Sequence, residues 1–177
     1  MRGMVGRLRK SIAVLNIQLR KIEGVYARME EHEKELFDRC VKYTSEGDHA
    51  RAVLYANECA ELRKILLNIL KAKLALERVI LELHTIETPE DATALPKLIN
   101  VLTALRKQLG GIAPDVSHKI NRTADELSRL VARLNIIPPL ESTNREAEKI
   151  LEEAERTAEE RLKDKPEIPK HNIEELR

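Results

Sequence analysis

The chain has 177 residues, of which 31 are basic, 30 are acidic and only 2% are aromatic. Large aromatic side chains dominate most globular cores, whereas long helices are rich in Leu, Ile, Ala, Glu, Lys and Arg, as this chain is. No apolar run approaches the roughly 18 residues that cross a bilayer, so the composition favours an all-α protein without a membrane span.

A first long helix is predicted from about residue 8 to the glycine at position 47. Its apolar residues are separated by alternating steps of four and three, a heptad pattern that indicates a coiled-coil seam. Only one position of this pattern is polar, and it is a glutamate. The seam consists of Leu8, Ile12, Leu15, Leu19, Ile22, Tyr26, Met29, Glu33, Leu36, Cys40 and Tyr43.

A second long helix follows a short break that contains Gly47, suited to ending a helix, and Asp48, suited to capping the next one. Because the break is so short, the second helix must fold back on the first, which predicts an antiparallel hairpin over about residues 7–86. The second helix carries one more apolar stripe than this hairpin needs, and a further helix of this chain or of a neighbouring one should cover it. This extra stripe consists of Leu66, Leu70, Leu74 and Leu81.

Two shorter helices are predicted over about residues 89–134. Thr88 and Asp91 have the spacing of a helix cap, and Pro96 predicts a kink or a restart shortly after it. A Gly-Gly pair then separates the third helix from the fourth. With the hairpin, these helices make up a predicted helical core of residues 1–134.

Residues 135–177 are predicted to form a linker, a regulatory helix and a proline-containing tail. The prolines of "NIIPPL" cannot continue a helix, and Thr143 and Glu146 have the spacing of a capping box that opens the fifth helix. Residues 141–177 contain twelve acidic and eight basic residues, and few of their apolar residues are large. We therefore expect this helix to dock weakly and to act as a displaceable switch that covers the extra stripe.

The sequence shows no enzyme signature. It has no Gly-rich phosphate loop, no nucleophile elbow and no clustered acid–base pair, and His49 beside Asp48 fits a helix cap with a solvated neighbour. Cys40 and Cys59 fall at apolar helix positions, which predicts buried thiols in a reducing compartment. We therefore expect no catalytic activity, no metal and no cofactor.

Six basic residues precede the first acidic residue, Glu23. On a helical wheel they lie opposite the heptad seam, so they should face outward. Such a face could be merely solvated, could bind nucleic acid, or could bind an anionic membrane surface, where each Lys or Arg contributes about 1 kcal/mol. Nucleic acid is disfavoured because no stacking aromatic residue lies nearby. The predicted membrane-binding residues are Arg2, Arg7, Arg9, Lys10, Arg20 and Lys21.

The apolar residues at the start of the chain have two interpretations. Met1, Met4, Val5 and Leu8 could add a short amphipathic membrane anchor, or they could continue the seam and pack inside the protein. The sequence leaves both open.

In its long-range pattern, the chain resembles the ESCRT-III superfamily. The shared features are a basic first helix, a Gly-Asp tip, an apolar second helix that begins in "GDHARAVLYANECAELRK", and an acidic final helix. Within the superfamily, the chain is most similar to the archaeal cell-division proteins of the CdvB group. The resemblance covers residues 8–134, and the acidic last helix has the family's position.

This resemblance implies a helical hairpin that polymerises on the cytoplasmic face of the cell membrane and helps to constrict it at the division site. The implied partners are further copies of the chain, paralogous ESCRT-III subunits, anionic lipids and an AAA ATPase whose MIT domain binds proline-containing tails. The tail motif falls on Pro166, Ile168 and Pro169, although Lys165 stands where the family has an apolar residue. No winged-helix extension is present, so recruitment through such a domain is not expected.

A non-polymerising soluble helical adaptor or scaffold is the competing interpretation. It shares the hairpin but requires no binding by the basic face and no partner for the extra stripe. The polymer-forming interpretation instead makes the extra stripe of the second helix an interface between subunits.

Overall fold

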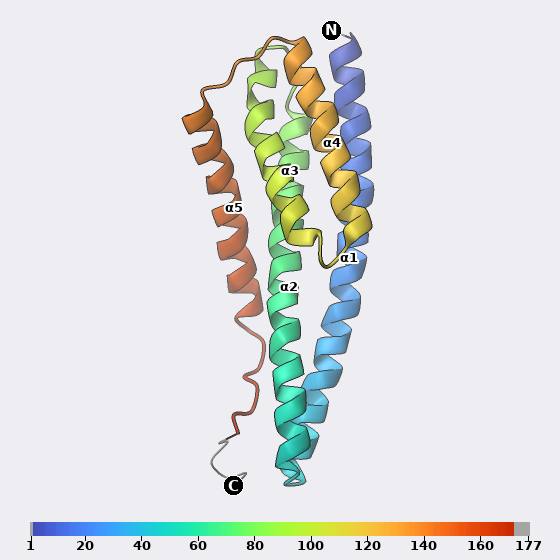
Figure 1. Ribbon diagram of the computed structural model, residues 1–177, viewed down its shortest axis with the longest axis vertical. Helices are drawn as coiled ribbons and strands as arrows, with labels where there is room; N and C mark the ends of the chain where they lie inside the picture. Colours follow the sequence, from blue (N-terminus) through green and yellow to red (C-terminus); the bar gives the residue numbers. More distant parts are fainter. Residues whose placement is uncertain (1, 172–177) are drawn as a thin grey trace.

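The computed structural model describes residues 2–171, except the side chain of Arg2, and within that range the chain forms only helices, turns and irregular segments. Two long helices, α1 (Arg2–Ser45) and α2 (His49–His84), form an antiparallel hairpin that runs the length of the molecule (Figure 1). α3 (Leu95–Leu109) and α4 (Pro114–Arg133) form a second, shorter hairpin against one half of the first, and α5 (Leu140–Leu162) lies along α2 and α3. The predicted all-α fold with a long antiparallel hairpin is confirmed.

Burial along α1 follows the predicted heptad seam. Leu8, Leu15, Ile22 and Cys40 are almost completely buried, and Glu33 is buried with them. Both cysteines are free and buried, as their apolar positions predict.

The turn between α1 and α2 uses the predicted residues. Gly47 has φ +76°, a left-handed conformation that a residue without Cβ adopts at little cost. The side chain of Asp48 accepts a hydrogen bond from the backbone N–H of Arg51 at 3.1 Å and caps α2.

The start of α3 combines two predicted features. The Asp91 N–H donates to Thr88 Oγ1 at 3.2 Å, and the Thr88 N–H donates to Asp91 Oδ2 at 2.9 Å, so the two residues cap each other. This pair opens only the 3-10 turn η1 (Asp91–Ala94), and α3 begins at Leu95. Pro96 fits the first turn of α3, where its missing N–H has no helical partner to lose.

The predicted start of α5 at Thr143 is wrong. α5 begins at Leu140, directly after the extended backbone of Pro139. The Thr143 side chain is buried and lies one turn inside the helix, where its N–H donates to the Pro139 carbonyl at 3.1 Å. Thr143 is therefore a small residue on the buried, docking face of α5, and it does not cap the helix.

The main core lies in the half of the molecule where all five helices meet. The leucines of α3 are fully buried because α3 contacts α2, α4 and α5. In the other half, the described residues are those of α1, α2, the end of α5 and the first part of the tail (Figure 1). The two halves of the hairpin therefore carry different surfaces.

Candidate functional site

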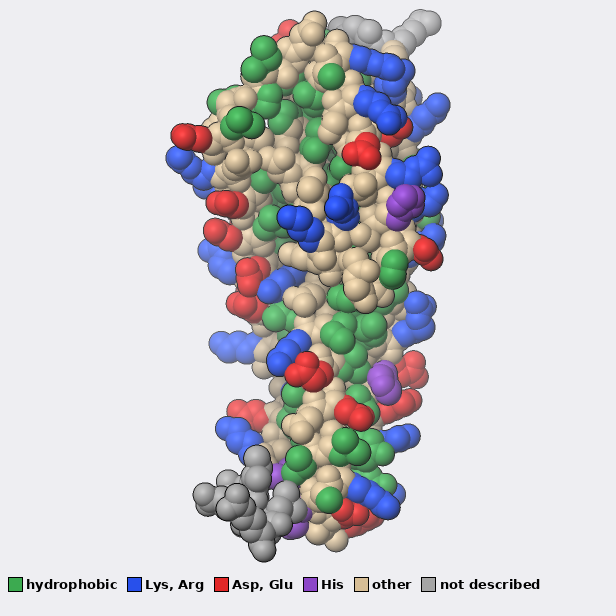
Figure 2. Space-filling model, in the orientation of Figure 1, with side chains coloured by type: hydrophobic (Ala, Val, Ile, Leu, Met, Phe, Trp, Pro, Cys, Tyr) green, Lys and Arg blue, Asp and Glu red, His purple; other side chains and the backbone are tan. Residues whose placement is uncertain are grey.

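The predicted membrane-binding residues lie on the exposed side of α1. Arg7, Arg9, Lys10, Arg20 and Lys21 are exposed, and none of them forms an ion pair with another described residue. The side chain of the sixth predicted residue, Arg2, lies outside the described part of the chain. Figure 2 shows Lys and Arg side chains gathered along the edge of the molecule where α1 begins.

The first turns of α1 favour the packing interpretation over the membrane anchor. Met4 and Leu8 are buried in the main core, and the half-buried Val5 packs against the same core. Met1 lies outside the described residues. An anchor that used Met4 would require this end of α1 to leave the core.

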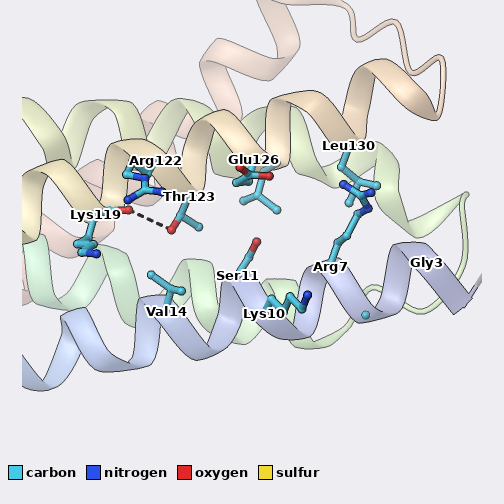
Figure 3. A pocket seen from close by; sticks show the side chains of 12 residues that line it. Gly3, Arg7, Lys10, Ser11, Val14, Lys119, Arg122, Thr123, Glu126 and Leu130 are labelled. Carbon is cyan, nitrogen blue, oxygen red and sulfur yellow. Dashed lines mark hydrogen bonds between the residues drawn. The ribbon is translucent and has the colours of Figure 1, made fainter.

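α4 extends the basic surface of α1, an extension that was not predicted from the sequence. α4 lies beside the first half of α1, and its Lys119 and Arg122 are exposed. Together with Arg7 and Lys10 they line a groove of about 610 Å³ between the two helices (Figure 3). The only sequence signal was the spacing of three that places Lys119 and Arg122 on one side of α4.

A second groove continues the basic surface farther along α1. Arg20, Lys21 and Arg28 line it together with the turn between α3 and α4, and its volume is about 650 Å³. Ile17, which is 52% exposed, also lines this groove. The outward side of α1 therefore offers cations with an apolar residue among them.

After α5, the tail runs along the half of the hairpin that α3 and α4 leave open (Figure 1). Arg63 Nη1 of α2 donates to the Pro166 carbonyl at 2.7 Å. Ile168 is half-buried against a small apolar cluster of α1 and α2 that contains Leu36, Cys59 and Leu62.

The end of the described tail reaches the hairpin turn. His171 Nε2 lies 3.1 Å from Thr44 Oγ1, and the His171 ring meets the His49 ring edge-on, with 5.8 Å between their centroids. His49 is exposed beside the Asp48 cap, as predicted, but it is also a neighbour of the tail.

Glu33, the one polar residue of the heptad seam, pairs with both α2 and the tail. Its side chain is 3% exposed, and its carboxylate lies 2.7 Å from Arg63 Nε and 3.0 Å from Lys165 Nζ. Burial alone would raise the pKa of the Glu33 carboxyl, but the hydrogen bonds and charges of Arg63 and Lys165 outweigh it and hold this pKa below its ordinary value. Glu33 is therefore an anion at neutral pH, and the tail supplies one of its two cations.

The carboxylate of Glu33 also affects the nearby thiol of Cys59. Cys59 Sγ lies 3.4 Å from Glu33 Oε1. Burial, followed by this hydrogen bond and the negative charge, raises the pKa of the Cys59 thiol to about 11. Cys59 is thus a protonated, unreactive thiol at neutral pH.

The predicted ATPase-binding motif is held against the hairpin in this conformation. Pro166 contributes its carbonyl, and Ile168 and Pro169 are half-buried. Lys165, which departs from the family's apolar residue, is the residue that binds Glu33.

The predicted subunit interface on α2 is mostly covered within the chain. Leu66 and Leu70 are buried, and Leu74 is half-buried against the main core. Leu81 is 65% exposed and is the only one of the four that is open to a partner in this conformation.

α5 packs along α2 and α3 through a face of mostly small residues. Lys71 Nζ of α2 lies 2.8 Å from Glu155 Oε1 of α5, and Asn100 of α3 donates to Asn144 of α5 at 2.9 Å. The buried residues of α5 are Thr143, Ala147, Ile150, Ala154 and Ala158.

Two proteins of Sulfolobus acidocaldarius are similar to this chain over most of its length. The chain is 35% identical to Cell division protein B1 over 159 residues, which cover 86% of this chain and 74% of the relative. The chain belongs to the CdvB group of ESCRT-III proteins. It is also 30% identical to Cell division protein B over 175 residues, which cover 92% of this chain and 66% of that relative. No protein-family model matches the chain, and no solved structure does either.

Membership of the CdvB group confirms the resemblance seen in the sequence and gives the chain a role in archaeal cell division. Each helix within residues 2–171 is too polar or too short to span a bilayer. Within the same residues, no group of three His, Cys, Asp or Glu side chains could hold a metal ion.

Proposed function

We propose that this CdvB-group chain is a polymer-forming subunit that binds the anionic inner face of the cell membrane and helps to constrict it at the division site. The row of exposed cations on α1, which form no ion pair with a described residue, carries the proposal. A surface cation that makes no ion pair in its own chain is available to a lipid headgroup, and each contributes about 1 kcal/mol near an anionic membrane. The proposed role is structural, with no catalysis, cofactor or nucleic-acid partner.

The membrane test is co-sedimentation with anionic vesicles. Changing Arg7, Arg9 and Lys10 to Glu should remove most of the binding, because the three exposed side chains then repel the surface. The matched control changes three exposed basic residues of α5 to Glu and should bind like the wild type; these are Arg145, Lys149 and Arg156. If both variants lose binding equally, net charge rather than the face of α1 governs it. High salt should weaken the wild-type binding, because exposed charges are screened beyond about 8–10 Å.

The proposed protein partners are further copies of this chain and paralogous ESCRT-III subunits. Leu66 and Leu70 are covered in the described conformation, so we propose that they join Leu74 and Leu81 in a subunit interface when α5 leaves. A fully buried large side chain contributes about 1.5–3 kcal/mol, and α5 buries a single one, Ile150. Contacts with a membrane or with neighbouring subunits could supply enough free energy to displace such a helix.

The proposed ATPase partner binds the tail through its MIT domain. Pro166, Ile168 and Pro169 are in contact with the hairpin, so this binding would first require the tail to separate from α1 and α2. The two states of the tail would then be mutually exclusive.

A soluble, non-polymerising adaptor is the second candidate, and one observation favours it. Leu66 and Leu70 are already buried within a single chain, as a stable monomer requires. Electron microscopy of the purified protein with and without anionic vesicles separates the two functions. A polymer-forming subunit should coat or tubulate the vesicles, whereas an adaptor should stay monomeric or dimeric.

A further inference from the structure

The groove between α1 and α4 brings four cations together from two helices. Arg7 and Lys10 belong to α1, Lys119 and Arg122 belong to α4, and all four line the same cavity of about 610 Å³ (Figure 3). This is more than a charged helix face, because α4 supplies a second wall.

The described residues do not neutralise these four cations. None of them forms an ion pair within the described residues, and the one acidic residue that lines the groove, Glu126, lies 2.9 Å from Arg129 Nη1. Cations gathered in one cavity repel one another, so a bound anion would lower their electrostatic energy. Arginine and lysine side chains suit a phosphate group, since a guanidinium can bind two of its oxygens at once. Arg7 and Lys119 lie at opposite ends of the groove, so one phosphate would contact only some of the four cations (Figure 3).

Two glycines make room in the groove. Gly3 and Gly6 line it from α1, although glycine is disfavoured in helices relative to alanine. A Cβ added at either position would meet no atom within 4 Å, so no contact inside the chain requires a residue without a side chain there. The missing side chains instead allow an external group to approach the backbone of α1.

The rest of the groove lining has both polar and apolar parts. Ser11 is only 8% exposed, and its hydroxyl points into the space between the helices (Figure 3). Val14 of α1 is half-buried and supplies apolar surface, and the hydrocarbon stems of the lining Lys and Arg side chains add to it. Leu127 and Leu130 are buried beneath the groove. Free phosphate would leave this apolar surface unused, whereas a phosphate attached to a hydrocarbon chain would cover it.

We propose that this groove binds the phosphate headgroup of an anionic lipid, with the first part of the lipid chain against Val14 and the hydrocarbon stems of the lining cations. The proposal rests on the proposed function, in which this side of α1 meets an anionic membrane. The cavity has the size of a small-ligand site, which favours a lipid headgroup over a whole helix from a second copy of the chain.

The test titrates the full chain with dihexanoyl phosphatidylglycerol below its micelle concentration and follows backbone amides by NMR. Gly3, Gly6, Ser11 and Thr123 should shift saturably. Inorganic phosphate, which lacks the chain, should bind at least about tenfold more weakly. Equal binding by inorganic phosphate, shifts spread evenly over the surface, or no saturable shift would each overturn the proposal. Shifts that follow protein concentration without lipid would assign the groove to a second copy, which also overturns it.

Paired variants test the groove residues. Changing both Lys119 and Arg122 to Gln should weaken the short-chain lipid about tenfold or more, since two cations are lost. Changing Lys107 and Arg133 to Gln removes the same charge from exposed positions outside the groove and should have little effect. Equal effects of the two double variants would contradict the site.

Filling the groove gives a second, uncharged test. Gly6→Leu should remove saturable lipid binding while the thermal unfolding midpoint is unchanged or higher, because its Cβ meets open space and leucine is the better helix former. Gly111→Leu is the control, since a Cβ there also meets nothing within 4 Å and Gly111 does not line the groove. Undiminished lipid binding by the folded Gly6→Leu protein would refute the groove.

The groove and the proposed function fail in different ways. If the wild type co-sediments with anionic vesicles but the soluble lipid causes no saturable shift, the groove is wrong and the membrane-binding face stands. If the soluble lipid binds in the groove but vesicles do not recruit the protein, the groove stands and the proposed function is wrong.

Discussion

Replacing Lys165 with Ala should release the tail while the hairpin stays folded. Lys165 Nζ lies 3.0 Å from Glu33 Oε2, and the Lys165 side chain is only 16% exposed. Arg63, 2.7 Å from the same carboxylate, still neutralises Glu33 in this variant. The substitution therefore removes a contact of the tail without leaving an unpaired charge inside the hairpin.

The size of the effect follows from this geometry. A hydrogen bond to a charged group contributes about 1.5–3 kcal/mol, and the partial exposure of Lys165 lowers this to about 1–2 kcal/mol. The released tail should therefore become about five- to thirtyfold more populated. Arg63→Ala should destabilise the whole hairpin by about 3 kcal/mol or more, because the buried Glu33 carboxylate then keeps only Lys165 of the tail as a cation.

The assay is the rate of cleavage by Glu-C endoproteinase after Glu167, with the Ile168 methyl signal in NMR as a second measure. Lys163→Ala is the matched control, because Lys163 is exposed and forms no ion pair with a described residue. The reasoning is refuted if Lys165→Ala leaves the cleavage rate unchanged, or if Lys163→Ala raises it equally. A thermal unfolding midpoint that falls more for Lys165→Ala than for Arg63→Ala would refute it as well.

Three further predictions concern the tail and α5. Because folding lowers the pKa of Glu33, the pairing stabilises the docked tail above the ordinary carboxyl pKa of 4.5 and is lost as the pH falls through the lower folded value. The Ile168 methyl signal should therefore change in acid, and Glu33→Gln should remove that change. Truncation after Leu140 should lower the protein concentration at which filaments form, seen by sedimentation; a truncated protein as small and soluble as the full chain would make α5 a spacer. Deletion of the residues after Asp164 should abolish binding of the MIT domain without affecting polymerisation, and an unchanged affinity would direct attention to "NIIPPL".

The parts of the fold that sequence could predict are those set by local periodicity. The heptad steps predicted the buried side of α1, and Gly47 with Asp48 predicted the turn. Both features depend only on residues a few positions apart in the sequence. The predicted role of Thr143 as the cap of α5 was wrong, because the spacing between Thr143 and Glu146 fits a helix cap and a small residue on a docking face equally well. Local pattern does not distinguish these two uses.

The surfaces were harder to predict because they depend on contacts distant in sequence. Lys119 and Arg122 join the basic face only because α4 folds onto α1, which no periodicity shows. Glu33 and Lys165 are 132 positions apart. The single hint in the sequence was the glutamate itself, a charged residue at a seam position where every other residue is apolar or aromatic.

Glu33 adds little stability to the seam, but it connects α1 specifically to α2 and to the tail. A buried ion pair can often be replaced by apolar residues without loss of stability, so apolar residues in place of Glu33 and its cations together would serve the hairpin as well or better. Replacing Glu33 alone would leave Arg63 without its partner. A polar residue inside a coiled-coil seam usually fixes register or partner, and here its partners are one cation of α2 and one of the tail. The tail binds the half of the hairpin beyond α3 and α4, while the basic face and its groove lie on the half that they cover. Release of the tail therefore requires no rearrangement of the basic face, and the two activities should be separable by mutation.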